Sequence, residues 1–190
     1  MTRFIAYTLG VLVLFTSVSL AADVPKIPTR EVVVGWDQAG YTLGWCEVDG
    51  EGFLDFHKIT VKPQAGWLLC WKPMEWKAGV LNELPVPKAP FVLDLGFTTI
   101  TDAGLKELAN FKQLTTLCLN QTKISDAGLI EIAMLNLTRL EVQATQVTDT
   151  GLKELPNMKT LRRLDLGRTK VTDQGVKDLQ KALPNCKIVK

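Results

Sequence analysis

Four aspartates that recur at a near-constant spacing are the first candidates for chemistry. Asp102, Asp126, Asp149 and Asp173 each follow a Ser or Thr and precede a Gly by two positions. A row of aligned carboxylates could bind calcium. A Ser or Thr followed by Asp is also a good helix start, because the hydroxyl caps the first turn and the carboxylate complements the helix dipole. We expect this structural role, and no metal.

The residue types that usually perform catalysis are scarce. His57 is the only histidine, which is too few for the usual zinc sets, and no nucleophile elbow, Walker loop or dinucleotide fingerprint occurs. We therefore expect neither enzymatic activity nor a cofactor. Of the four cysteines, Cys46 and Cys70 lie in the same short block and are the expected disulfide, whereas Cys118 and Cys186 are expected to be too far apart to bond.

The aspartates belong to repeats of about 24 residues, and the repeats must position everything else. Ahead of each aspartate lies a strand-like leucine pattern, and behind it apolar residues follow a helical spacing. One strand and one short helix per repeat predict an α/β solenoid over residues 90–190, with four repeats and a C-terminal cap. Its parallel strands line the concave side and its helices the convex side. The terminal residues 186–189 are expected to add a last strand.

The repeated pattern L-x-x-L-x-L-x-x-T-x-I-T-D-x-G-L resembles leucine-rich repeats of the cysteine-containing and ribonuclease-inhibitor-like subtypes. The same form resembles repeats of secreted bacterial proteins of unknown role. The resemblance implies the solenoid fold. It implies little about function, because such repeats serve many partners.

Residues 22–89 read as a small β-rich block with strands expected at 31–36, 41–48, 53–61 and 66–71, followed by a proline-rich linker over 81–90. The block contains all five tryptophans, and we expect it to cap the first repeat. The tryptophans either form its core or offer a stacking surface to a glycan or peptide. The aromatic candidates are Trp36, Trp45, Trp67, Trp71 and Trp76.

The first 21 residues have the layout of a secretory signal peptide: a basic start, an uncharged apolar run and small residues at Ser19 and Ala21. We expect a secreted or periplasmic protein, anchored at its N-terminus if the segment is retained. The chain carries 22 basic and 20 acidic residues, a net charge of +2, which gives no indication of nucleic-acid binding.

The strand pattern also predicts which side chains line the concave face, the usual binding face of solenoids. Acidic residues flank arginines there, so the face is either a polar protein-binding surface or a solvated sheet whose charges pair with each other. A paired-carboxylate site from Asp94, Glu141 and Asp165 is disfavoured, because Cys118 interrupts the column and an exposed sheet would not raise a carboxyl pKa. The expected binding residues are Asp94, Thr116, Cys118, Arg139, Glu141, Arg163, Asp165 and Arg168.

These observations predict an exported, non-enzymatic protein whose concave repeat face binds another protein. The first alternative is glycan or cell-wall binding through the tryptophan-rich block. A second alternative is a ubiquitin-ligase adaptor of the F-box repeat type, which the expected signal peptide and the lack of an F-box-like helical segment before Phe91 oppose.

Overall fold

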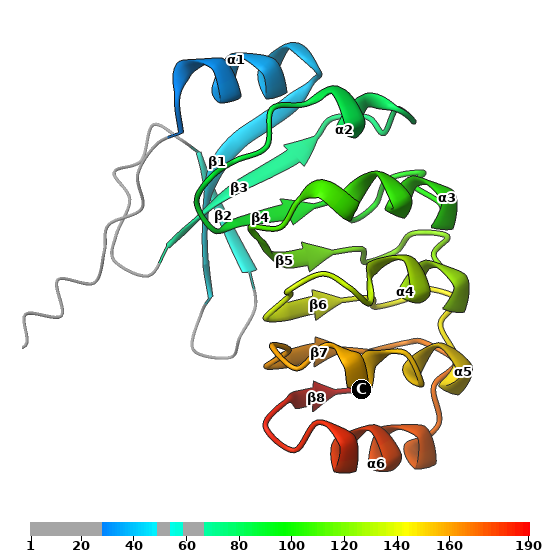
Figure 1. Cartoon of the computed structure of the whole chain (residues 1–190). Coiled ribbons are helices and arrows are strands. Elements are labelled where there is room, and N and C mark those ends of the chain that lie inside the picture. The colour runs from blue at the N-terminus through cyan, green and yellow to red at the C-terminus, as the bar shows by residue number, and fades with distance from the viewer. Residues whose placement is uncertain (1–27, 49–53, 59–66) are drawn as a thin grey trace, which may run out of the picture.

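One eight-stranded sheet runs through the protein, with strand order β2-β1-β3-β4-β5-β6-β7-β8 (Figure 1). The structure is a computed structural model that describes residues 28–48, 54–58 and 67–190. The expected signal peptide, residues 1–21, lies outside these ranges. No helix in the described ranges is both long and apolar enough to cross a membrane.

The first block contributes three antiparallel strands. β1 (Tyr41–Val48) lies between β2 (Leu54–Lys58) and β3 (Leu68–Pro73). The strand expected at 41–48 is confirmed. β3 overlaps the strand expected at 66–71 but begins at Leu68 and runs on to Pro73, and residue 66 lies outside the described ranges. β2 falls within the strand expected at 53–61, and the flanking residues 53 and 59–61 lie outside the described ranges.

The strand expected at 31–36 is wrong, because residues Arg30–Gln38 form helix α1. Val32 and Trp36 lie one helical turn apart and are both buried, while Val34 between them is exposed. Trp36 also donates its indole N–H to the Pro85 carbonyl at 2.9 Å. Burial of one helical face therefore outweighs the strand preference of the three consecutive valines.

Parallel strands and short helices alternate from residue 91 onward, and β3 pairs in parallel with the first of these strands. The first block and the repeats therefore share one sheet. The strands are β4 (Phe91–Asp94), β5 (Leu114–Cys118), β6 (Arg139–Glu141), β7 (Arg163–Asp165) and β8 (Lys187–Val189). The helices are α3 (Asp102–Leu105), η1 (Lys106–Asn110), α4 (Asp126–Ile132), α5 (Asp149–Leu152), η2 (Leu155–Asn157) and α6 (Asp173–Ala182).

An aromatic cluster lies between the first block and the first repeat. The Trp36 ring lies 4.8 Å from Trp71 and 5.7 Å from Phe111, and Trp71 lies 5.5 Å from Phe91. These side chains belong to the same core as the inward leucines of the repeats. Aromatic packing thus covers the N-terminal end of the repeat core.

The expected linker over 81–90 is held against the repeats. It includes most of the short helix α2 (Val80–Glu83), whose first backbone N–H groups are held by the buried Glu107 carboxylate. One carboxylate oxygen accepts from Gly79 at 2.7 Å and the other from Leu81 at 3.1 Å. This clamp joins the end of the first block to the first repeat.

Candidate binding surface

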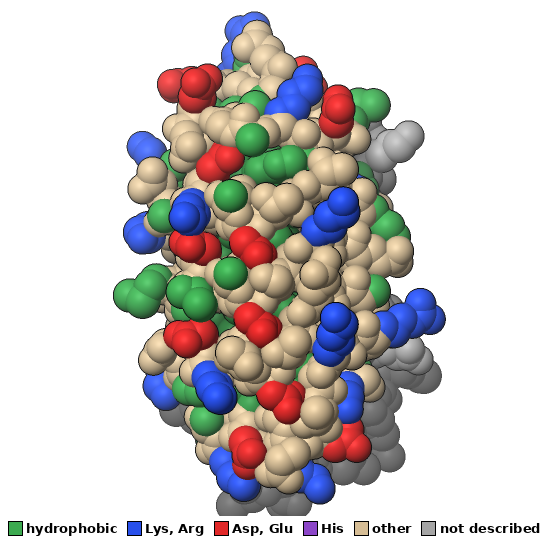
Figure 2. Space-filling view, turned by 90° about the vertical axis from the view of Figure 1, so that its right-hand side faces the viewer, with side chains coloured by type: hydrophobic (Ala, Val, Ile, Leu, Met, Phe, Trp, Pro, Cys, Tyr) green, Lys and Arg blue, Asp and Glu red, His purple; other side chains and the backbone are tan. Residues whose placement is uncertain are grey.

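The recurring aspartates link each repeat to the next. Asp126 accepts hydrogen bonds from the Thr148 backbone N–H at 2.7 Å and from the Thr148 hydroxyl at 2.6 Å. Asp102 makes the same pair of bonds to Ser125, and Asp149 makes it to Thr172. Acidic side chains accordingly recur from repeat to repeat on the side where the strands end (Figure 2). We call these three contacts the aspartate clamps.

The recurring glycines make room for the clamps. A methyl group on Gly151 would come within 2.5 Å of the Asp126 carboxylate and 3.0 Å of its Cα, and Gly128 stands in the same relation to Asp102. Gly104, in the first repeat, would meet the Trp76 ring at 2.7 Å instead. Trp76 therefore occupies the place that an aspartate takes in later repeats, and at the other end Lys190 pairs with Asp173.

The helix caps follow the expectation in three repeats. The hydroxyls of Ser125, Thr148 and Thr172 accept a hydrogen bond from the first turn of the following helix, whereas Thr101 makes no such bond. A second repeated threonine also bonds to the backbone in all four repeats. Its hydroxyl donates to a carbonyl three residues earlier at 2.6–2.7 Å, from Thr98, Thr122, Thr145 and Thr169.

The last aspartate clamp, between Asp149 and Thr172, should change the pKa of the Asp149 carboxyl by a measurable amount. Hydrogen bonds from the hydroxyl and then the backbone N–H of Thr172 hold the pKa of the Asp149 carboxyl below its ordinary value. A lowered folded-state pKa stabilises the fold above the carboxyl's ordinary pKa, and this contribution is lost as the pH falls through the folded-state pKa. Thr172→Val should therefore raise the pKa of Asp149 toward its ordinary value, as followed by NMR of the carboxyl carbon.

Asp178 provides the internal control for that titration. Its pKa is lowered by hydrogen bonds from Gln174 and Lys181 rather than from Thr172. An Asp149 titration unchanged by Thr172→Val, or an equal shift at Asp178, would contradict the assignment of the clamp.

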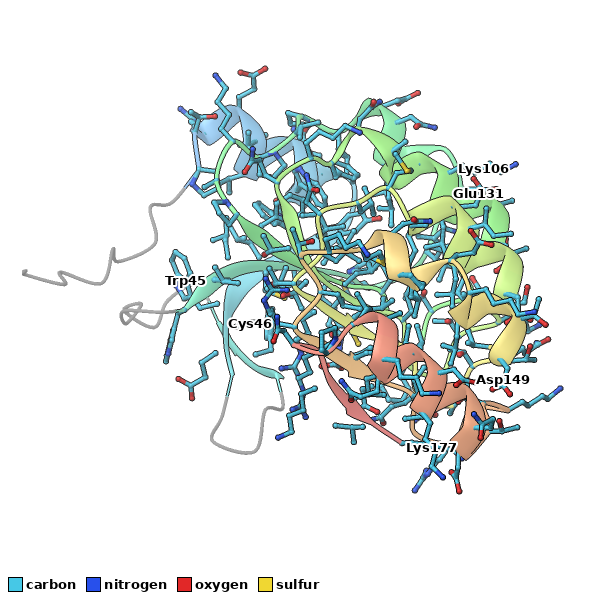
Figure 3. All side chains as sticks on the ribbon, turned by 60° about the horizontal axis from the view of Figure 1, so that its bottom comes forward. Trp45, Cys46, Lys106, Glu131, Asp149 and Lys177 are labelled. Atoms are coloured by element: carbon cyan, nitrogen blue, oxygen red, sulfur yellow. The ribbon has the colours of Figure 1, made fainter. Side chains whose placement is uncertain are left out.

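The predicted concave columns are confirmed by the strand register. Thr116, Arg139 and Arg163 lie side by side on neighbouring strands, and so do Cys118, Glu141 and Asp165. Asp94 continues the second column and pairs with Lys72 at 2.8 Å. This face lies on the side of the sheet away from the helices that carry Lys106, Asp149 and Lys177 (Figure 3).

Most of the expected binding residues are buried, which the sequence pattern did not predict. Arg163 and Asp94 are half-buried, and Arg168 is exposed. The buried ones are only 3–7% exposed: Thr116, Cys118, Arg139, Glu141 and Asp165. Their role in binding stays a prediction, since the register places them on one face but leaves little of each accessible.

Contacts within the sheet satisfy both buried carboxylates. Glu141 accepts from Arg139 Nε at 2.8 Å and from the Asn120 amide at 2.8 Å. Asp165 accepts from the Gln143 amide at 2.6 Å and from the Gly167 backbone N–H at 3.0 Å. These groups hold neighbouring strands together, so the face resembles an internal hydrogen-bond network more than a pair of catalytic carboxylates.

The expected disulfide is absent, because Cys46 and Cys70 are free thiols in this structure. Cys46 lies opposite Leu68 and Cys70 opposite Gly44, so the two are diagonal neighbours in the antiparallel pair. Residues at diagonal positions are roughly 7–8 Å apart, with their Cβ atoms somewhat closer, and the Cys46 and Cys70 side chains are near enough to hydrogen-bond to each other as thiols. Burial raises the pKa of the Cys70 and Cys118 thiols, so both stay protonated at neutral pH and are poor nucleophiles.

The tryptophans form core rather than an exposed surface. Trp36, Trp45 and Trp71 are fully buried, Trp67 is 7% exposed, and Trp76 is half-buried against Gly104. A stacking surface for a glycan needs at least two rings exposed on one side, and these five side chains do not supply it. The glycan hypothesis thus loses its structural basis, and the core interpretation accounts for all five.

Accessible side chains lie instead at the ends of the strands. Phe97, Gln121, Ala144 and Arg168 occupy the same position in successive repeats, all with positive φ of 52–61°. We call this row the strand-end rim. Phe97 is 70% exposed, and Met74, just beyond the end of the neighbouring strand β3, is 88% exposed. The sequence alone could have pointed to this site, because Phe97 is the only aromatic residue among the four equivalent positions of the rim.

Comparisons with known proteins agree with the repeat architecture. The family model described as leucine-rich repeat matches residues 92–109 and 157–179. No curated protein matches the sequence. A solved leucine-rich repeat protein of Leptospira interrogans is 22% identical, with a TM-score of 0.40, over 63% of this chain and 35% of that chain. This chain thus spans about a third of that protein's length. The repeats and their shared parallel sheet give this chain the fold of a leucine-rich repeat solenoid, and two of its segments match the family model.

Proposed function

We propose that the protein is an exported, non-enzymatic binding protein that holds a protein partner on the strand-end rim. Export rests on the signal-peptide layout of residues 1–21. A binding role is supported by the repeat fold, whose strand side commonly presents a binding surface. The repeat subtype, cysteine-containing or ribonuclease-inhibitor-like, remains an expectation from the sequence pattern.

One observation carries the proposal: two large apolar side chains, Phe97 and Met74, stand exposed at the ends of adjacent strands. Leu93 on β4 lies opposite Trp71 on β3, so the residues after both strands meet at the same edge. The Thr98 hydroxyl holds the turn beneath Phe97 through the Leu95 carbonyl. An exposed aromatic side chain on a hydrogen-bonded turn, with a second exposed apolar side chain at the same edge of the sheet, is the kind of anchor on which protein interfaces depend.

The test is binding to protein from the secreted or cell-envelope fraction of the source cells. Purified protein serves as bait, and the affinity of the captured partner is then measured for variants. Phe97→Gln, which installs the residue found at Gln121 in the next repeat, should weaken binding at least tenfold.

A matched control comes from the convex side. Met134 is 82% exposed at the end of α4, where the neighbouring repeats carry Asn110 and Asn157. Met134→Asn also removes an exposed apolar side chain and should leave the affinity within twofold. Equal losses in both variants, or no partner whose capture depends on Phe97, would overturn the proposal.

A further inference from the structure

Two cysteines are neighbours on the concave side of the first block. Cys46 lies on β1, next to Trp45 in the chain (Figure 3), and Cys70 lies on the adjacent strand β3. Cys70 stands opposite Gly44, which has no side chain, so the Cys46 side chain has room to lean toward it. The two thiols are hydrogen-bonded to each other. The pairing of β1 with β3 therefore brings together two oxidisable sulfur atoms that are far apart in the chain.

This pair of cysteines is separate from the main core. Cys46 and Cys70 are 4% and 0% exposed, and they form a small buried cluster with Val92, which lies beside Cys70 on β4. The half-buried side chains of Phe56 and Leu68 pack against this cluster. Cys46 and Leu68 form the last residue pair of the β1–β3 ladder. The thiols thus lie at the end of a ladder, where local opening gives a small reagent access.

A disulfide between these cysteines would pull the two strands together. Residues at diagonal positions are roughly 7–8 Å apart, whereas the Cα atoms that a disulfide joins are usually about 4.4–6.8 Å apart. Closing this gap moves the strand ends by about an ångström, and a strained disulfide is more easily reduced than an unstrained one. The geometry favours a bond that forms and breaks over a permanent one.

We infer that Cys46 and Cys70 form a reversible disulfide when the folded protein meets a small external disulfide. The pair is then a redox-sensitive link between β1 and β3. The inference does not depend on a protein partner or on the strand-end rim. Export, as proposed above, would place the protein in an oxidising compartment, where disulfides form and persist.

The reaction consists of two successive thiol–disulfide exchanges. Cys46 reacts first, because it keeps some exposure and because burial raises the pKa of the Cys70 thiol. The Cys46 thiolate attacks one sulfur of the external disulfide and releases the other sulfur as a thiolate. Cys70 then loses its proton, attacks the Cys46 sulfur and releases the second thiolate. One S–S bond forms in the protein and one breaks in the reagent, and two electrons and two protons pass to the two external thiols.

The other two cysteines lie too far away to compete. Cys118 is on β5, two strands from Cys70, and at ~4.8 Å per strand this gap is roughly 10 Å. A disulfide requires Cα atoms within about 7 Å of each other. Cys186 belongs to the main core, beside the last strand of the stack. Cys118 is therefore the matched control, since it is a buried thiol on the same side of the sheet with no thiol in bonding range.

The test treats the purified, folded protein with oxidised glutathione at about pH 8, where thiolates are populated, and then alkylates the remaining thiols. Mass spectrometry should show the loss of two hydrogen atoms and a peptide pair linked through Cys46 and Cys70. Reduced glutathione at about 10 mM should break this bond again without denaturant. Cys118→Ala should leave the result unchanged. Cys46→Ala should abolish the bond, and Cys70→Ala should trap Cys46 as its mixed disulfide with glutathione.

Circular dichroism checks that each variant is folded, and the two single variants Cys46→Ala and Cys70→Ala test the bond independently. No bond in the folded wild-type protein, a bond that includes Cys118, or a bond between two chains would overturn the inference. A Cys46–Cys70 bond that resists reduced glutathione in the folded protein would also overturn it, because such a bond is permanent. None of these outcomes bears on the proposed function, which Phe97→Gln tests.

Discussion

Replacing Arg139 with alanine is expected to destabilise the protein by about 3–5 kcal/mol, the usual cost of breaking a buried ion pair from one side. The Arg139 and Glu141 side chains are only 6% and 9% exposed, and their closest atoms lie 2.6 Å apart. Removal of the guanidinium leaves the Glu141 carboxylate buried, with the Asn120 amide as its remaining side-chain partner among the described residues. Urea unfolding at pH 7 measures the loss in unfolding free energy.

The double variant Arg139→Met/Glu141→Leu is the control. It removes both charges of this pair and keeps apolar volume, so it should lose less unfolding free energy than Arg139→Ala, because no carboxylate of the pair is left buried without its guanidinium. A loss below about 1 kcal/mol for Arg139→Ala would contradict the burial of this pair. The same result explains why Arg139 is a poor choice for testing binding: its loss would weaken the fold itself.

Replacing Gly151 with alanine is expected to cost about 2–3 kcal/mol, because the new methyl group overlaps the Asp126 carboxylate and backbone. The aspartate clamp to Thr148 must shift to make room, and its two hydrogen bonds weaken. Thermal or urea unfolding of the variant measures the loss in the free energy of unfolding. Gly167→Ala is the matched control, since its methyl would lie no nearer than 3.3 Å to a neighbouring atom.

A double-mutant cycle tests whether overlap with Asp126 causes the destabilisation expected for Gly151→Ala. Asp126→Ala removes the carboxylate that the Gly151 methyl would meet, so Gly151→Ala should cost less in that background, with a coupling of about 1 kcal/mol or more. Additive losses would mean that Gly151 is required for another reason than the clamp. The residual cost in the double variant reports the contact with the Asp126 backbone, which remains.

The fold of the repeats was predictable because the residue pattern that determines it is local and recurs in each copy. Each inward leucine and each capping residue appears at the same offset in every copy, so four examples support each assignment. The aspartates were assigned only to the helix that they begin. Their bonds to the next repeat join residues 22–23 positions apart, and no local pattern shows such a contact.

The first block was less predictable because it has no second copy. Arg30–Gln38 carries three valines in a row, which favours a strand, and only the burial of Trp36 against Trp71 and Phe111 makes it a helix. The buried Glu107 clamp on α2 joins residues 26 and 28 positions apart. Contacts of this kind become visible only in the folded chain.

For the candidate site, the sequence predicted which face of the sheet the residues occupy but not how deeply they are buried. Strand alternation placed Arg139, Glu141 and Asp165 on one face correctly, but alternation says nothing about how closely neighbouring strands pack their side chains. The Asn120 and Gln143 amides satisfy these acids and draw them into the sheet. The exposed part of the surface consequently lies three residues farther along the chain than these acids, at the strand-end rim.

Hydrogen exchange of the protein with and without its captured partner shows directly whether the partner lies on the strand-end rim. We expect binding to slow amide exchange in the turns that hold the strand-end rim, at residues 95–98, 119–122, 142–145 and 166–169. Amides of α3, α4 and α5 on the convex side should exchange at unchanged rates. Protection confined to those helices, with exchange at the rim unchanged, would show that the partner binds elsewhere.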